Sequence, residues 1–264
     1  MTGLRHGLRK LLARVAAIVH LRRWVRRRDA RDSETPLPPR RGKYLYAAPI
    51  GESGKAQLEK LLARLDPAQF DFLIFVYDGY RFDGEIFSRC RFIHEQGIVY
   101  HFFKKYVTPE LAAQYDVIFL GVEDVEIDDF DSRRFLDVMK RNRLDMAAPA
   151  LSGRSITPHR IMYRRDPGVG RLVDVIEIFL TAFDARAWPR FWALIDADRN
   201  HWGWGYVQLA QSCCEFKMGL VDCETVSVLR PPTFKKEAQD EMHALFARHP
   251  ECRRASFVSY GKLR

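Results

Sequence analysis

The chain is poor in cysteine, and its few cysteines are not arranged as in common disulfide or zinc frameworks. There are five of them, an odd number, and no two form a Cys-x-x-Cys pair. Disulfide-rich domains and structural zinc sites are typically recognised by even sets or by such pairs. We therefore expect neither a disulfide framework nor a zinc site, and we expect a reducing compartment. The adjacent Cys213 and Cys214 are expected to be small helix residues.

The N-terminal segment lacks an apolar run that could cross a bilayer. Its leucines and valines are interrupted by Arg14 and His20, and no small-residue cleavage site follows them. A spanning helix and a secretory signal are both disfavoured. Instead, apolar residues recur at helical spacing with arginines between them, which predicts a cationic amphipathic helix over residues 1–32. A proline-rich linker at 33–42 separates it from a body at 43–264.

The body of the chain has no net charge. The net charge of +9 lies within residues 1–41, which hold twelve Lys and Arg against three acids. A specific nucleic-acid reader is therefore not expected. The leader is compatible with a membrane-surface anchor, an organelle transit peptide or a helix that packs on a partner. We favour an anionic membrane surface bound through residues 1–31, and thus a cytoplasmic, peripheral membrane protein.

Apolar runs of strand length alternate with helical patterns along the body. Strands are predicted at 43–48, 70–77, 117–122, 146–150, 173–179 and 219–229, and helices around 58–65, 132–142, 188–195 and 237–248. The region 82–114 reads as helical in pieces. This alternation predicts an α/β fold with a mostly parallel central sheet. The stretch 51–55 misses the phosphate-binding P-loop pattern, because Pro49 and Ala56 occupy two of its required positions.

Two of the predicted strands end abruptly in acids. The strand at 117–122 runs into Glu123 and Asp124, and the strand at 70–77 runs into Asp78 and Gly79. Ligands of open α/β sheets bind beyond the carboxyl ends of the strands. Carboxylates there can hold a hard cation, which can hold a diphosphate. The alternative is that each acid caps the next turn or helix.

Several fragments occur in a familiar order. They are Tyr77-Asp78-Gly79, residues 102–110, residues 115–124, residues 149–151, residues 175–178, Trp202-Gly203-Trp204-Gly205 and residues 219–222. Over residues 43–233 the chain resembles an uncharacterised domain family assigned to glycosyltransferases, some of whose members carry a lysine-ketoglutarate-reductase label. That family is similar to the GT-A nucleotide-diphospho-sugar transferases. The resemblance implies a GT-A-like, Rossmann-type sandwich, a nucleotide-sugar donor, a glycan or other hydroxyl acceptor, and a divalent metal on an Asp-x-Asp-type loop.

The chain departs from that pattern at three places. Val122 replaces the first acid of the metal loop, Tyr206 and its neighbours replace an acidic pair after the tryptophan run, and Val228 stands where a histidine is common. These departures leave open a second hypothesis, a catalytically degenerate GT-A-like module that binds a sugar, a nucleotide or a protein partner.

The expected site residues follow from the chemistry of sugar transfer. Carboxylate oxygens suit Mn²⁺ or Mg²⁺, which stabilises the leaving diphosphate. The predicted metal ligands are Asp124, Glu123 and Asp222. Asp78 and Gly79 are expected at the nucleotide, unless they only form a turn. The run Trp202, Gly203, Trp204 and Gly205 is expected at the sugar, unless it is a packed core loop. The catalytic base is predicted to be Glu177, with Asp196 and Asp198 as alternatives.

Overall fold

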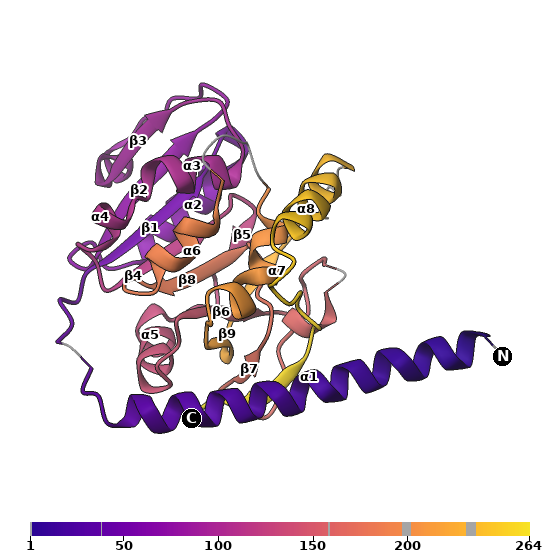
Figure 1. Cartoon of the computed structure of the whole chain (residues 1–264). Coiled ribbons are helices and arrows are strands. Elements are labelled where there is room, and N and C mark those ends of the chain that lie inside the picture. The colour runs from indigo at the N-terminus through magenta and orange to yellow at the C-terminus, as the bar shows by residue number, and fades with distance from the viewer. Residues whose placement is uncertain (1, 38, 158, 197–201, 231–235) are drawn as a thin grey trace.

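One sheet organises the molecule (Figure 1). The computed structural model describes residues 2–37, 39–157, 159–196, 202–230 and 236–264, with side chains from residue 7 onward. The strands are β1 (Tyr44–Pro49), β2 (Phe70–Val76), β3 (Cys90–His94), β4 (Val117–Gly121), β5 (Val125–Glu126), β6 (Met146–Leu151), β7 (Arg171–Val173), β8 (Leu180–Asp184), β9 (Met218–Val228) and β10 (Ser259–Lys262).

The helices alternate with these strands along most of the chain. They are α1 (Thr2–Ser33), α2 (Lys55–Arg64), α3 (Val99–Tyr106), α4 (Pro109–Ala112), α5 (Ser132–Arg141), α6 (Trp188–Leu194), α7 (Trp204–Cys213) and α8 (Lys236–Arg248), with short 3-10 turns η1 (Glu52–Gly54), η2 (Glu85–Arg89) and η3 (Arg160–Met162).

The described strands join in the order β10-β7-β9-β6-β8-β4-β1-β2-β3, and β5 pairs separately with β9. The strands β3, β2, β1 and β4 are parallel to one another, and β6 is parallel to β9. Strand β8 runs antiparallel to both β4 and β6, and β7 and β10 continue the sheet in antiparallel pairs. The α/β class is confirmed, with a parallel half and a mixed half.

Helices cover both faces because side chains alternate along each strand. On β4, Phe119 packs against Phe135 of α5, with ring centroids 5.8 Å apart. Its neighbour Ile118 pairs with Phe183 of β8, which packs on Trp188 of α6 at 5.1 Å. Helices α5 and α6 therefore lie on opposite faces of the sheet, which makes the core a layered sandwich.

Most of the predicted body elements are present. The predicted strands at 43–48, 70–77, 117–122, 146–150 and 219–229 are confirmed as β1, β2, β4, β6 and β9, and the predicted helices as α2, α5, α6 and α8. The region 82–114 holds η2, α3 and α4, as expected, together with β3, an edge strand that was not predicted.

The predicted strand at 173–179 is wrong. Strand β7 ends at Val173 and β8 begins only at Leu180, so Glu177 lies in the connection between them. The cause is Asp174, which is buried and accepts backbone N–H bonds from Ser256 (2.6 Å) and Val258 (2.8 Å). A carboxylate bound to another segment in this way ends the ladder.

The absence of disulfides was also wrongly predicted. Cys213 and Cys252 form a disulfide across 39 residues. The sequence argument failed because it looked for pairs close in sequence, whereas these two meet only once α7 and the end of α8 are packed together.

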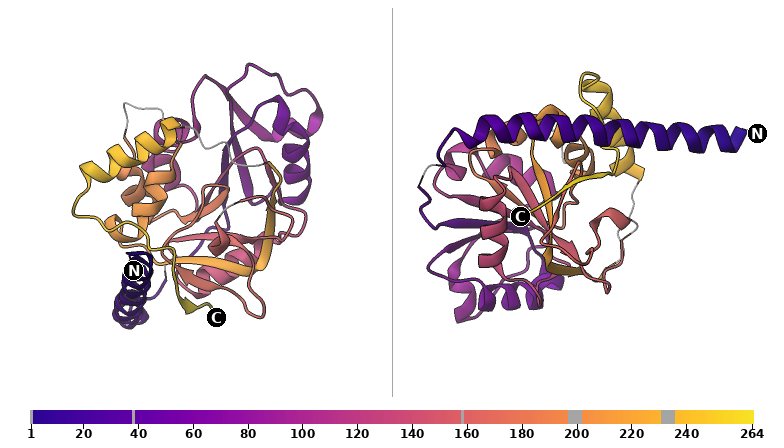
Figure 2. Two further views of the ribbon diagram at one scale, coloured as in Figure 1. Left: turned by 90° about the vertical axis from the view of Figure 1, so that its right-hand side faces the viewer. Right: turned by 90° about the horizontal axis from the view of Figure 1, so that it is seen from below.

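Helix α1 lies along the edge of the body and projects beyond it (Figures 1 and 2). Leu21 and Val25 are buried against the body, and Arg22 donates to the carbonyl of Tyr260 at 2.9 Å. Further along, Lys217 donates to Asp29 at 2.6 Å. Among the described helices, none is both long and apolar enough to cross a membrane. The leader is thus a helix, and half of it is docked on the body.

Asp145 fastens this helix to the body. Its side chain is largely buried and binds Arg28 of α1, Arg190 of α6 at 3.1 Å and the backbone N–H of Lys217 at 2.7 Å. Three elements far apart in sequence therefore share one carboxylate. Removing it leaves the N–H of Lys217 without this acceptor, while Arg28 keeps Asp32 and Arg190 keeps the carbonyl of Cys214.

We expect Asp145→Ala to lower the free energy of unfolding by about 2 kcal/mol, because the N–H of Lys217 loses its acceptor and Arg28 loses one of its two carboxylate partners. Urea unfolding followed by circular dichroism measures this. The matched control is Asp240→Ala, which removes an exposed pair with Lys236 and should cost less than about 1 kcal/mol. Equal midpoints for the two variants would contradict the role given to Asp145.

Candidate functional site

The carboxyl ends of β1, β2 and β4 lie side by side at one edge of the sheet, here called the rim. The strands are parallel and in register, with β1 paired to β2 on one side and to β4 on the other. The turn η1 follows β1, Asp78 follows β2, and Glu123 and Asp124 follow β4. The acids that follow β2 and β4 therefore lie at one edge of the sheet, as the sequence predicts.

Glu123 is held by bonds to several neighbouring groups. Its carboxylate accepts from the N–H of Gly51 (3.1 Å), the hydroxyl of Ser53 (2.9 Å), the phenol of Tyr77 (2.7 Å) and the guanidinium of Arg230 (3.1 Å). Hydrogen bonds of this number fix the side chain in one orientation. Glu123 therefore ties the ends of β1, β2 and β4 to the chain after β9.

Asp78 also has a structural task. One carboxylate oxygen accepts the N–H of Glu52 at 2.7 Å, and the other accepts the N–H of Tyr80 at 3.1 Å. Gly79 follows with φ of +76°, a left-handed conformation that favours glycine. A side chain at Gly51 would overlap the Asp78 carboxylate. The pair thus forms a turn clamped onto the η1 loop, and Asp78 remains exposed at the rim.

Asp124 differs from Glu123 and Asp78 in its hydrogen bonding. It is half-buried, and burial raises the pKa of its carboxyl, an effect that the neighbouring Arg230 opposes. Among the described residues, no other side chain hydrogen-bonds to its carboxylate. It lies two residues past Val122, whose N–H donates to the carbonyl of Phe179 at 3.1 Å. Asp124 is therefore a partly desolvated acid without a side-chain partner in the described part of the chain, and it lies next to the segment that carries Glu177.

Glu177 is buried at this edge, and among the described residues its carboxylate has one side-chain partner. Its Oε1 lies 3.0 Å from Nε2 of His159. Burial raises the pKa of Glu177 to about 8 and lowers the pKa of His159. Both directions favour the uncharged pair near neutral pH, with the Glu177 hydroxyl donating to His159, although the distance alone would fit an ion pair. Two titratable groups in such close contact titrate as a pair.

Aromatic rings enclose this pair. The His159 ring lies 4.7 Å from the ring of Trp204 and 5.7 Å from that of Phe257, between centroids. Trp204 begins α7. Of the tryptophan run, Trp204 is thus the residue whose ring packs on His159, the partner of Glu177.

The rest of that run is used in packing. Gly203 has φ of +97°, and a side chain there would overlap the ring of Tyr100. A side chain at Gly205 would come within 2.9 Å of Leu245 on α8. The backbone N–H of Trp202 donates to Glu241 at 2.9 Å. The two glycines therefore permit close approach between helices, whereas the expectation was close approach to a sugar.

Two other predicted residues, Asp222 and Asp196, are engaged in ion pairs. Asp222 is buried in an ion pair with Arg171 and accepts the N–H of Arg165 at 2.9 Å, which leaves it outside the set of free carboxylates. Asp196 forms an ion pair with Arg248. Asp198 lies outside the described residues. Of the predicted metal ligands, Asp124 is the one without a side-chain partner in the described part of the chain. Of the predicted bases, Glu177 is the one that pairs with a histidine, His159.

The sequence reasoning missed several residues of the rim. They are Ser53, Tyr77, His159 and Arg230. Ser53 sits in the near-match to a P-loop, which was the one local signal available. His159 and Arg230 are single polar residues in loops, and only the fold brings them to their partners.

Comparison with solved structures shows the fold of this chain. The crystal structure of S. aureus TarS 1-349 in complex with UDP is similar with a TM-score of 0.51 and 10% identity, over 78% of this chain and 64% of that one. A further crystal structure of S. aureus TarS has a TM-score of 0.49 and 9% identity, over 78% of this chain and 39% of that one. This chain spans less than two thirds of the length of the first. The GT-A-like fold class is thereby shown.

A search of curated proteins found no match to this sequence. The family model described as protein of unknown function DUF707 matches residues 15–171, more than half of the sequence. The matched segment runs from the docked part of α1 through the η1 loop, Asp78, Asp124 and His159 to the start of β7. The chain belongs to this DUF707 family.

Proposed function

We propose that this protein is a glycosyltransferase that transfers a sugar from a nucleotide-diphosphate donor to a hydroxyl acceptor at the rim. The observation that carries the proposal is Asp124, a partly desolvated carboxylate at the ends of parallel strands to which none of the described side chains donates. It occurs in a fold shared with a protein crystallised with UDP. Open α/β sheets bind their ligands at this edge.

The residues at the rim fit a divalent cation. Mg²⁺ and Mn²⁺ prefer oxygen ligands, and one or two protein carboxylates suffice when phosphate oxygens complete the shell. Asp124 would be the first ligand, and Glu123 the second only if it gave up part of its hydrogen bonding. When bound, the ion would supply positive charge to the leaving diphosphate. Arg230, which already contacts Glu123 at 3.1 Å, offers a second positive charge at the same place.

The acceptor would bind beside Trp204 and give its proton to Glu177. In that step the acceptor oxygen bonds to the anomeric carbon while the bond from that carbon to the diphosphate oxygen breaks, and the hydroxyl proton goes to the Glu177 carboxylate. His159 holds the carboxylate in place at 3.0 Å. A flat aromatic face such as that of Trp204 suits the C–H surface of a sugar.

Two observations favour the alternative, a binding module that has lost catalysis. The Glu123 carboxylate is occupied by four donors, and Val122 stands where the related family has its first acid. A site with a single available carboxylate could hold a nucleotide without turning it over. The donor-binding and activity measurements below separate these two functions.

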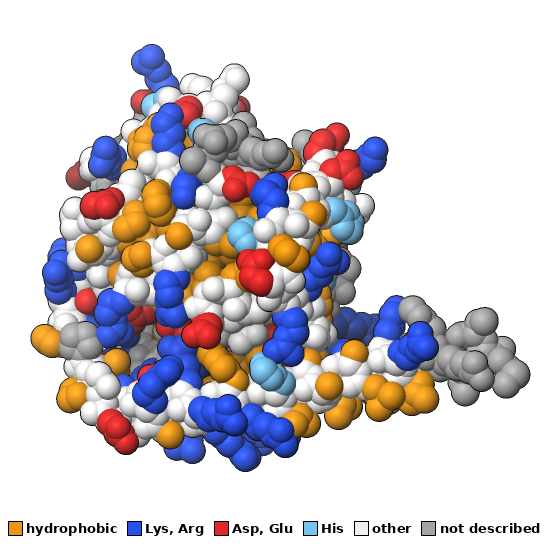
Figure 3. Space-filling model, in the orientation of Figure 1, with side chains coloured by type: hydrophobic (Ala, Val, Ile, Leu, Met, Phe, Trp, Pro, Cys, Tyr) orange, Lys and Arg blue, Asp and Glu red, His pale blue; other side chains and the backbone are white. Residues whose placement is uncertain are grey.

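We further propose that α1 binds an anionic membrane surface. Its projecting part exposes a stripe of apolar side chains beside Lys and Arg, which Figure 3 shows along the lower edge of the molecule. The described members of the stripe are Leu8, Leu11, Leu12, Val15 and Val19, each more than two fifths exposed. An apolar stripe flanked by cations is the pattern of a helix that lies in a lipid headgroup layer.

We expect UDP with Mn²⁺ to raise the unfolding temperature of the wild-type protein, and UDP alone to raise it less, because the ion links the diphosphate to Asp124. In Asp124→Asn, which keeps the shape and removes the charge, the Mn²⁺-dependent part of the shift should vanish. Thermal unfolding with Mn²⁺ and UDP varied independently measures both.

The matched control is Asp129→Asn, an exposed acid in the connection between β5 and α5 that should leave the shift unchanged. A wild-type protein that does not respond to UDP or to other nucleoside diphosphates would contradict the donor site. A response that survives Asp124→Asn would move the site elsewhere on the rim.

We expect Glu177→Gln to abolish transfer while preserving the fold. The amide can still donate to His159, but it cannot accept a proton, so the rate should fall at least about 100-fold. Wild-type activity should rise with pH towards about 8, the pKa of Glu177 in the folded protein. Product formation from a panel of nucleotide sugars, measured across pH 5 to 9, tests both.

Glu177→Gln should also change how the free energy of unfolding depends on pH. The pKa of Glu177 is about 8 in the folded chain and 4.5 for an ordinary glutamate, so between these values the folded state holds a proton that the unfolded state has lost. Wild-type stability should therefore fall with rising pH across this window, by up to about 1.4 kcal/mol per pH unit, relative to Glu177→Gln. Parallel pH profiles for the two proteins in urea unfolding would show that Glu177 is not buried in this way.

We expect the intact chain to sediment with vesicles of phosphatidylcholine and phosphatidylserine, and less with phosphatidylcholine alone. The double variant Leu11→Asp, Leu12→Asp should lower the partition coefficient at least about 10-fold, because each buried leucine contributes about 1.5 kcal/mol or more. The control is Ile156→Asp, which removes an exposed apolar residue from the body. Unchanged binding by the double variant would exclude this surface of α1.

A further inference from the structure

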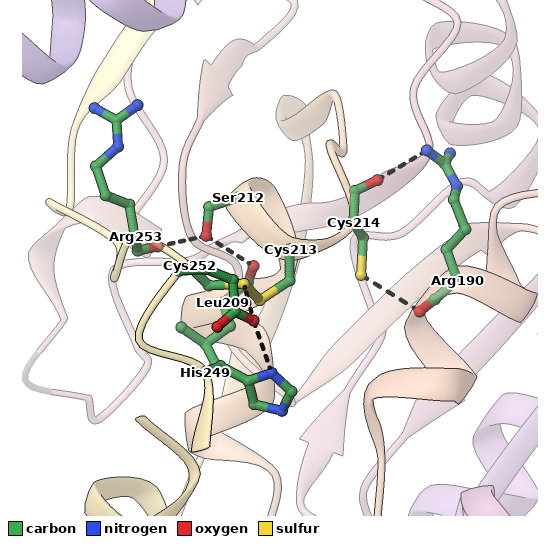
Figure 4. The surroundings of a disulfide bond; sticks show 9 residues. Arg190, Leu209, Ser212, Cys213, Cys214, His249, Cys252 and Arg253 are labelled. Carbon is green, nitrogen blue, oxygen red and sulfur yellow. Dashed lines mark hydrogen bonds and ion pairs between the residues drawn. A yellow bond between two sulfur atoms is a disulfide. The ribbon is translucent and has the colours of Figure 1, made fainter. Parts of the chain in front are cut away.

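A cluster of sulfur, nitrogen and oxygen donors lies at the C-terminal end of α7, the helix that begins at Trp204. Cys213 ends α7, and His249 and Cys252 follow directly after α8 (Figure 4). One ligand atom from each of the three lies within 4.8 Å of the other two, and all three residues are half-buried. The described chain thus gathers two cysteine sulfurs and an imidazole at one half-buried place, although the sequence predicted no zinc site.

A fourth donor stands beside them. Oε1 of Glu251 lies 3.2 Å from Nδ1 of His249 and 3.6 Å from Sγ of Cys252. Ligand atoms around a tetrahedral zinc ion are separated by roughly 3 to 4 Å, as follows from bonds of about 2.0 to 2.3 Å. The turn His249-Pro250-Glu251-Cys252 therefore supplies three donors from four consecutive residues, and Cys213 supplies the other from α7.

We propose that the reduced form of this cluster is a zinc site, with Cys213, Cys252 and His249 as ligands and Glu251 at the fourth position. The disulfide is opened by a thiol reductant. Two electrons and two protons pass to the cysteines, and the reductant leaves as its own disulfide. Zn²⁺ then displaces the two thiol protons and binds the thiolates. Thiolate and imidazole donors in a tetrahedral set favour Zn²⁺ over Mg²⁺ or Mn²⁺.

The zinc ion replaces the disulfide as a tether. The residues after α8 lie against α7, where Ser212 donates to the carbonyl of Arg253 at 2.6 Å and Ala255 donates to the carbonyl of Gln208 at 3.0 Å. Either a disulfide or a zinc ion at Cys213 and Cys252 fastens these two segments. A reducing environment, which opens the disulfide, would thus leave the connection intact as long as zinc is present.

The first test measures zinc uptake by the whole chain. The protein is reduced with a phosphine, freed of metal and titrated with Zn²⁺ against a chromophoric chelator. The reduced protein should bind one ion per chain, and the oxidised protein should bind none at this site. Co²⁺ in place of Zn²⁺ should give the thiolate-to-metal absorption of a tetrahedral site. A reduced protein that takes up no zinc would overturn the proposal.

Variants assign the ligands. His249→Ala keeps the disulfide and hence the oxidised fold, and after reduction it should bind zinc at least about 10-fold more weakly, since even outer-shell partners of a metal are worth that much. Cys252→Ser should bind none. The control is Cys223→Ser, a half-buried thiol on β9 outside the cluster, which should bind as the wild type does.

Zinc should also raise the unfolding temperature of the reduced wild-type protein and of Cys223→Ser, but not that of Cys252→Ser. Equal zinc affinity in reduced wild type and reduced His249→Ala would remove the imidazole from the site and overturn the ligand set. Loss of binding in Cys223→Ser would place the ion elsewhere.

Discussion

The rim depends on the reversed direction of one strand, β8. It lies between β4 and β6 and runs antiparallel to both, so it begins where they end. Its first residue, Leu180, pairs with Gly121, the last residue of β4. The segment that leads into β8 must therefore arrive at the rim, and Glu177 arrives with it. A parallel strand in this position would place that segment at the opposite edge of the sheet, away from Asp124.

The four acids at the rim divide into two kinds. The carboxylates of Asp78 and Glu123 accept hydrogen bonds on both oxygens from the loops around them, and these bonds hold the strand ends together. Asp124 and Glu177 have few partners, and burial raises the pKa of both. A carboxylate that lacks donors in a desolvated place gains most from a cation or a proton. Asp78 and Glu123 therefore hold the loops of the site in place, and we propose Asp124 and Glu177 for metal binding and proton transfer.

Sequence reasoning predicted the features that depend on local pattern. An apolar run of strand length that ends in acids is visible in the sequence, and parallel strands must end at one edge, so Asp78 and Asp124 could be placed together. Glu177 was assigned to a strand because apolar neighbours surround it, and the acceptor role of Asp174 towards Val258 could not be seen across more than 80 residues. The pairing of His159 with Glu177 likewise depends on how two loops meet, which no local pattern encodes.

The segment after α8 connects the cysteine cluster to the rim. It begins at the tether between Cys252 and Cys213 and ends where Val258 donates to Asp174. Between these two points Phe257 adopts φ of +56°, a conformation that non-glycine residues rarely hold, with its ring stacked on His159. Such backbone strain persists only where the flanking contacts over-determine the position. The Asp174 bonds fix one flank and the cysteine tether fixes the other. The Phe257 ring on His159 is therefore positioned in part by the link between Cys213 and Cys252, which we propose to be a disulfide when oxidised and a zinc site when reduced.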